Sequence, residues 1–79
     1  MTKKEALEWI AQTFEEDPNR ITETTSRDQI AAWDSLGILT LMANLDQDFG
    51  LVLPSGVVQT WSSVGDVLAS LKENGRLKE

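Results

Sequence analysis

Apolar residues recur at the spacing of an α-helix in three separate parts of the chain, and no part shows the strict alternation of a β-strand. The first part covers residues 3–15, the second and longest covers residues 35–49, and the third begins near Ser62 or Ser63. A chain of 79 residues is long enough for one small domain with a thin core. We therefore expect an all-α fold in a single domain, residues 1–79.

The residues between these segments indicate where each helix ends. The first pattern stops before Pro18, and Gly50 is well placed as the C-terminal cap of the second helix. Pro54 can open a short additional helical turn, and Gly75 is expected to end the last helix.

The polar segment from residue 18 to residue 34 predicts a loop that is long for so small a domain. Three large apolar side chains interrupt it: Ile21, Ile30 and Trp33. Because such side chains are usually buried, we expect them to anchor the loop on the core.

The segment 35–49 places apolar residues on two opposite sides of the predicted helix. At about 100° per residue, one arc contains Ile38, Leu41, Met42, Leu45 and Phe49. The opposite arc contains Leu36, Leu39, Thr40 and Ala43. We expect the first arc to face the core and the second to be a docking surface. Two alternatives stay open: the long loop folds over the second arc, or its leucines are scattered surface residues.

The chain contains neither cysteine nor histidine. Disulfides, thiolate nucleophiles, imidazole bases and the common zinc sites are therefore excluded. A small helical domain also has little room for an enclosed pocket in which a serine could be activated. We expect no catalytic residues and no metal site, so the protein is predicted not to be an enzyme.

Thirteen acidic residues against seven basic ones give a net charge of −6. This charge repels nucleic acid and anionic membranes and favours partners that present lysine and arginine. No apolar run approaches the roughly 20 residues that span a bilayer, and the N-terminal segment lacks the apolar core of a signal peptide. We expect a soluble, cytoplasmic monomer that does not insert into membranes.

Ser35 follows Asp34 directly at the predicted start of the second helix. The unpaired N–H groups and the dipole of a helix N-terminus favour an attached or bound phosphate at this position. Both residues are also ordinary helix caps, so simple capping is the alternative interpretation.

The stretch "WDSLGILTLMANLDQDFGLVLP", residues 33–54, resembles the acyl carrier protein family. Asp34, Ser35 and Leu36 match the Asp-Ser-Leu signature that opens the family's second helix. The end of this helix, "NLDQDFGLVLP", and the start of the last one, "SVGD" at residues 63–66, are also similar to the family pattern. The resemblance covers nearly the full chain.

This resemblance implies an antiparallel four-helix bundle with three longer helices and one short helix, and a carrier function for the whole domain. Ser35 would carry 4′-phosphopantetheine through a phosphodiester, and the thiol of that arm would hold an acyl or aminoacyl group as a thioester. The cargo would go to biosynthetic enzymes of fatty acid, polyketide or related pathways. A phosphopantetheinyl transferase would attach the arm from coenzyme A, using Mg²⁺ held by the transferase.

The resemblance also implies which residues partner enzymes recognise. Asp34 flanks the attachment point. Acyl-loading and acyl-processing enzymes with basic docking surfaces would meet apolar contacts at Leu36, Leu39 and Ala43. The exposed face departs from the family's usual acidic pattern at Gly37, Thr40, Asn44 and Gln47. Recognition by basic surfaces is therefore expected to be weaker.

Gly37 is consistent with close approach of a partner or of the arm, or with a neutral substitution. The cargo stays open among acyl, aminoacyl and D-alanyl groups. A function of another class is an alternative: an unmodified helical interaction module whose second apolar face binds one partner helix.

Overall fold

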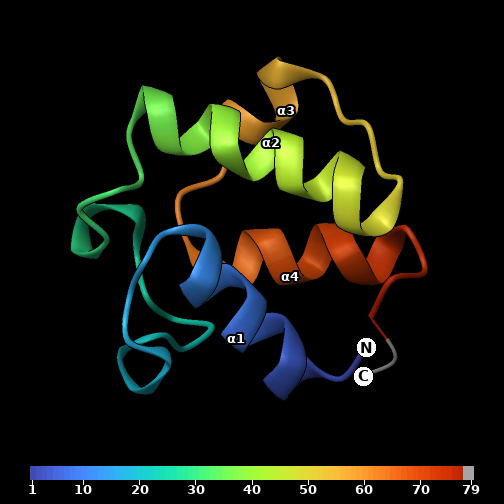
Figure 1. Ribbon diagram of the computed structural model, residues 1–79. Helices are drawn as coiled ribbons and strands as arrows, with labels where there is room; N and C mark the ends of the chain where they lie inside the picture. Colours follow the sequence, from blue (N-terminus) through green and yellow to red (C-terminus); the bar gives the residue numbers. More distant parts are fainter. Residues whose placement is uncertain (78–79) are drawn as a thin grey trace.

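The computed structural model describes residues 1–77, and the regular secondary structure in this range is helical (Figure 1). The elements are α1 (Lys3–Thr13), the 3₁₀ helices η1 (Pro18–Arg20) and η2 (Arg27–Gln29), α2 (Ser35–Phe49), α3 (Ser55–Gln59) and α4 (Val64–Glu73). In the described range, β-type backbone pairing is limited to an isolated antiparallel bridge between Ser26 and Ser63. The predicted all-α fold, with three longer helices and one short helix, is confirmed for these residues.

The helices form a small bundle in which α1 contacts both α2 and α4, and α3 contacts α2. In Figure 1, α1 runs from right to left, whereas α2 and α4 both run from left to right. The antiparallel order thus holds for α1 against its two neighbours, while α2 and α4 share a direction. None of the helices between residues 1 and 77 combines the length and the apolarity that a membrane crossing requires.

The core is built from the inward faces of the helices and from the apolar residues of the long loop. Its fully buried larger side chains are Phe14, Ile10, Leu41, Leu45, Leu71, Val58, Val64 and Val67. Ile21, Ile30 and Trp33 are each less than 5% exposed. The prediction that these three residues anchor the loop is confirmed.

The first helix ends two residues before the predicted position. Phe14 is its C-terminal cap, and Glu15 adopts a left-handed conformation with φ of 55°. The N–H of Glu16 then donates to the carbonyl oxygen of Ala11 at 2.8 Å, which closes the helix end. The predicted end at residue 15 is wrong. Phe14 is buried although it is the cap residue, and apolar spacing does not distinguish a buried cap residue from a residue of the last helical turn.

The other boundaries follow the predicted signals. The second helix covers residues 35–49, and Gly50 caps it with φ of 63°. Pro54 precedes α3 as its N-cap residue, and Ser63 holds the same position before α4. Gly75, with φ of 71°, follows the end of α4. Glycine has no Cβ and therefore adopts the left-handed backbone conformation at these two positions without steric strain, which explains why the helices end there.

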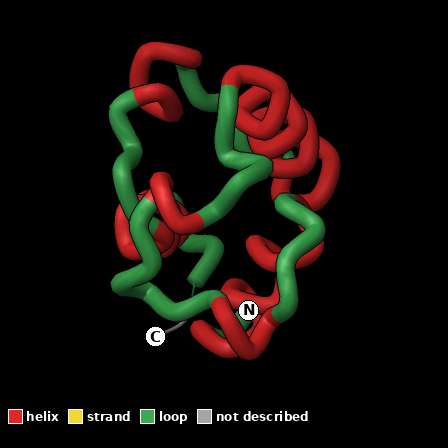
Figure 2. The backbone as a smooth tube through the Cα atoms, turned by 90° about the vertical axis from the view of Figure 1, so that its left-hand side faces the viewer, coloured by secondary structure: helices red, strands yellow, loops and turns green. Residues whose placement is uncertain are grey.

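The long loop is tied to the start of α4 by backbone hydrogen bonds. The N–H of Arg27 donates to Ser62 O at 2.7 Å, Val64 N–H donates to Thr25 O at 2.9 Å, and Gly65 N–H donates to Glu23 O at 2.8 Å. Figure 2, which views the bundle from the end at which α2 begins, shows loop segments running over this end. These bonds hold the loop that leads to Ser35 against the start of α4.

Candidate functional site

Asp34 alone provides the side-chain cap of α2. Its backbone is extended, and its Oδ1 accepts the N–H of Gly37 at 2.9 Å, while its carbonyl oxygen accepts the N–H of Ile38 at 2.8 Å. Ser35 is the first helical residue, and both residues are exposed. Within residues 1–77 the hydroxyl of Ser35 makes no hydrogen bond. Ser35 is thus available for chemistry and is not needed as a cap.

The turn before Ser35 is held by the core on one side. Trp33 is buried, and its ring stacks on that of Phe14 with centroids 5.1 Å apart and planes inclined by 19°. The carbonyl oxygen of Trp33 also accepts a hydrogen bond from Nε of Arg27 at 3.3 Å. Because Trp33 lies two residues ahead of Ser35, these contacts fix the position of the exposed serine.

Gly37 packs against the same turn. A Cβ added to Gly37 would lie 1.8 Å from the carbonyl oxygen of Ala32 and 3.4 Å from the ring of Phe14. Such an approach to a backbone atom is sterically impossible without movement of the turn. The chain's own backbone therefore accounts for the glycine, without the close approach of a partner or of an arm.

The two faces of α2 differ as predicted. Ile38, Leu41 and Leu45 are at most 6% exposed, whereas Leu36 is 73% and Leu39 is 63% exposed. The neighbouring Thr40 and Ala43 are exposed as well. The loop consequently does not cover the second arc, and the alternative in which it does is wrong. We refer to Leu36, Leu39 and Ala43 as the outer apolar face.

Two members of the predicted inward arc lie at its edge and are only partly buried. Phe49 packs edge-on against Trp9, with ring centroids 4.9 Å apart, and Met42 borders a surface groove. A similar difference occurs on α3, where Val58 is buried but Val57 is 44% exposed.

A groove of about 430 Å³ lies between α2 and α3, and Ser35 is part of its wall. Its apolar side chains are Ile38, Leu39 and Met42. Its other polar side chains are Arg27, Ser55 and Gln59. Arg27 comes from η2, and Ser55 and Gln59 are the first and last residues of α3. None of them belongs to a motif, so the sequence offered no signal that they would join Ser35.

Arg27 connects three segments around this groove. In addition to its bond to Trp33, its Nη1 donates to the carbonyl oxygen of Gln59 at 3.4 Å, at the end of α3. Its backbone N–H reaches Ser62, before α4. Arg27 therefore links the turn before Ser35 to the end of α3.

Most of the acidic residues in the described part of the chain have no basic partner. Between residues 1 and 77 the structure has one ion pair, in which Lys3 Nζ lies 2.7 Å from Glu23 Oε1. Asp66 is held differently: the N–H of Ser62 donates to its Oδ2 at 2.8 Å, and the N–H of Ser63 donates at 3.2 Å. Both backbone hydrogen bonds lower the pKa of Asp66 from its ordinary value of 3.8, and the bond from Ser62 has the larger effect.

Comparison with known proteins adds no assignment. No protein-family model matches this chain, and no curated protein matches its sequence. Function is therefore inferred from the geometry at the start of α2 and from the motif resemblance.

Proposed function

We propose that this chain is an acyl carrier protein that is modified with 4′-phosphopantetheine on Ser35 and carries an acyl or aminoacyl group between biosynthetic enzymes. The observation that supports this most directly is the exposed, unpaired hydroxyl of Ser35 at the first residue of α2. Three longer helices and one short helix, with the Asp-Ser-Leu tripeptide at the start of the second, also agree with an acyl-carrier-like bundle.

The backbone around Ser35 suits a phosphodiester. Asp34 takes up the N–H groups of Gly37 and Ile38, so those of Ser35 and Leu36 are left without a hydrogen-bond partner in the described part of the chain. Free N–H groups at a helix N-terminus stabilise phosphate oxygens. Such a diester forms when Ser35 Oγ bonds to the β-phosphorus of coenzyme A, loses its proton and displaces adenosine 3′,5′-bisphosphate.

When bound, the arm supplies the thiol that the chain itself lacks, and this thiol holds the cargo as a thioester. The chain's own residues position the arm. Ser35 lines the groove between α2 and α3, which offers an apolar wall of Ile38, Leu39 and Met42 to a group attached to this serine. No side chain in residues 1–77 is assigned a catalytic role, because the reactions belong to the partner enzymes.

The outer apolar face provides the contact for those enzymes. Leu36 follows Ser35 directly, and Leu39 lies about one helical turn further along α2. An enzyme that reaches the arm therefore meets both exposed leucines, and burial of their apolar surface at the contact favours association. The net charge of −6 favours a transferase and acyl-processing enzymes with basic docking surfaces.

Intact-mass measurement tests the modification. The purified chain is incubated with coenzyme A, Mg²⁺ and a phosphopantetheinyl transferase of broad specificity. We expect the mass to rise by one phosphopantetheinyl group in the parent and not at all in Ser35→Ala. Ser55→Ala is the matched control, since Ser55 borders the same groove, and it should be modified like the parent.

The alternative function, an unmodified interaction module, is favoured by the outer apolar face alone, because an exposed leucine pair does not require an arm. It predicts no mass change under any of these conditions. Modification of Ser35→Ala at another serine would contradict the assignment of Ser35.

A further inference from the structure

Arg27 is a charged residue in the wall of the groove, and its positive charge has no role in the attachment of the arm to Ser35 described above. Its side chain is partly buried and donates to two backbone carbonyl oxygens, those of Trp33 and Gln59. Carbonyl oxygens satisfy hydrogen bonds but do not neutralise a positive charge. In a chain of net charge −6, Arg27 makes no ion pair with any described acid.

The same side chain borders the groove together with Ser35. It is the charged residue of that lining. The two hydrogen bonds hold the guanidinium between the turn before α2 and the end of α3. Its other N–H donors have no partner in residues 1–77. A fixed guanidinium with free donors is a suitable group for binding an oxyanion.

We propose that Arg27 is the anion-recognising residue of this groove and that it pairs with an oxyanion tethered to Ser35. This inference rests on the proposed modification of Ser35. Phosphate and carboxylate oxygens share the chemistry that Arg27 recognises. The anion is therefore either the phosphodiester of the arm or a carboxylate at the end of the cargo. Pairing positions the arm along the groove, so Arg27 is a positioning residue and takes no part in catalysis.

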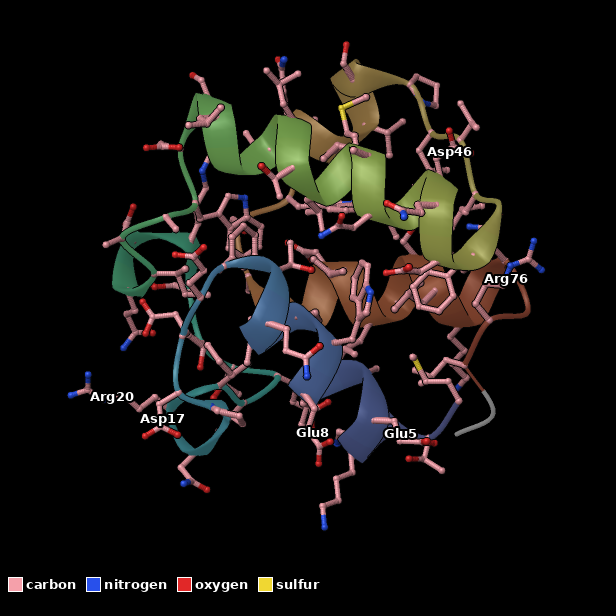
Figure 3. The ribbon with its side chains drawn as sticks, viewed as in Figure 1. Glu5, Glu8, Asp17, Arg20, Asp46 and Arg76 are labelled. Atoms are coloured by element: carbon pink, nitrogen blue, oxygen red, sulfur yellow. The ribbon has the colours of Figure 1, made fainter. Side chains whose placement is uncertain are left out.

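Arg76 provides a matched control within the same chain. Its Nε donates to the carbonyl oxygen of Phe49 at 3.1 Å, and its Nη1 donates to that of Asn74 at 3.3 Å. Figure 3 shows Arg76 beside the end of α2 that lies opposite Ser35. The two ends are about 20 Å apart for a helix of this length. Arg76 thus makes similar backbone contacts but is out of reach of an anion on Ser35.

The experiment compares melting temperatures of the unmodified and modified forms of the parent, Arg27→Gln and Arg76→Gln. Intact mass confirms modification first, so a failure of the proposed function is seen there, separately from this comparison. Each protein is measured with the bare arm, with a butyryl cargo and with a succinyl cargo. Succinyl has the same number of carbon atoms as butyryl, but a carboxylate replaces the terminal methyl group.

If Arg27 binds the phosphodiester, the rise in melting temperature on adding the bare arm is at least halved in Arg27→Gln and unchanged in Arg76→Gln. If it binds the cargo carboxylate, the loss is confined to the succinyl form. If Arg27 has only a structural role, Arg27→Gln lowers the melting temperatures of the unmodified and the modified protein by the same amount. Equal rises in the parent and in Arg27→Gln, with all three loads, would overturn the proposal.

A second measurement does not depend on the stability of the variant. The Nε–H resonance of Arg27 in ¹⁵N-labelled parent protein should shift on modification or on succinyl loading, whereas that of Arg76 should stay in place. An unshifted Arg27 resonance in every loaded form would equally overturn the proposal. Arg27→Lys, which keeps the charge but not the planar fork, should retain part of the rise in melting temperature.

Discussion

The carbonyl oxygen of Ala32 occupies the space into which any side chain at position 37 would project, 1.8 Å from the ideal Cβ position of Gly37. Because Ala32 lies in the turn that leads to Asp34 and Ser35, the absence of a side chain at Gly37 lets this turn pack directly on the first turn of α2. The position of the proposed attachment serine thus depends on a buried glycine that packs against the chain's own backbone.

We expect Gly37→Ala to destabilise the fold by about 1–3 kcal/mol, because the turn has to move away from the added methyl group. Helix propensity alone predicts the opposite sign, a gain of up to about 1 kcal/mol. Gly56→Ala in α3 is the control, since an added Cβ there meets no atom within 4 Å. Denaturant unfolding of both variants gives the signs. A stabilised Gly37→Ala would refute the steric argument.

The two faces of α2 should respond differently to substitution. Leu45 is 1% exposed, so Leu45→Ala should cost about 2–5 kcal/mol, a large share of the stability of so small a domain. Leu39 is 63% exposed, so Leu39→Glu should change stability by roughly 0.5 kcal/mol or less while slowing arm attachment or acyl loading. Unfolding curves and transfer rates measure the two effects. Unfolding of Leu39→Glu as severe as that of Leu45→Ala would show that the outer apolar face belongs to the core.

Asp34→Ala should cost about 0.5–2 kcal/mol, because it removes the acceptor of the Gly37 N–H at the start of α2. Asp34→Asn keeps an acceptor oxygen and should lose much less. Ser35→Ala should leave stability nearly unchanged, since the Ser35 hydroxyl makes no hydrogen bond within the described residues. The three unfolding free energies are compared under one condition. A loss in Ser35→Ala as large as that in Asp34→Ala would mean that the serine is part of the cap.

The lowered pKa of Asp66 makes part of the stability depend on pH. Its carboxylate is stabilised in the folded state, first by the hydrogen bond from the Ser62 backbone, so it contributes stability above its ordinary pKa of 3.8. That contribution is lost as the pH falls through the lower folded-state value. Asp66→Asn should therefore lower stability at pH 7 and reduce the further loss between pH 4 and the acid limit of folding.

Asp46→Asn is the control for Asp66, because Asp46 is exposed and its carboxylate makes no hydrogen bond within residues 1–77. It should leave the acid limb of the stability curve close to that of the parent. An acid limb in Asp66→Asn that is as steep as in the parent would show that other carboxylates govern acid unfolding.

The sequence by itself determined the bounds of α2, its two faces and the anchoring of the loop by Ile21, Ile30 and Trp33. These features depend on helical periodicity, on Asp34 and Gly50 as local caps, and on the burial of large apolar side chains. The periodicity and the caps act within a few residues along the chain, and the preference of large apolar side chains for burial belongs to each side chain itself.

Only the tertiary structure decided the rest of the site. Arg27, Ser55 and Gln59 meet Ser35 around one groove because η2, the start of α2 and α3 come together in space. The requirement for glycine at position 37 likewise comes from Ala32, and the early end of α1 places Phe14 where it stacks on Trp33. Local sequence patterns reflect only the interactions between residues that are close together along the chain. A groove, a steric contact and an unneutralised charge depend on segments that approach only when the whole core has packed.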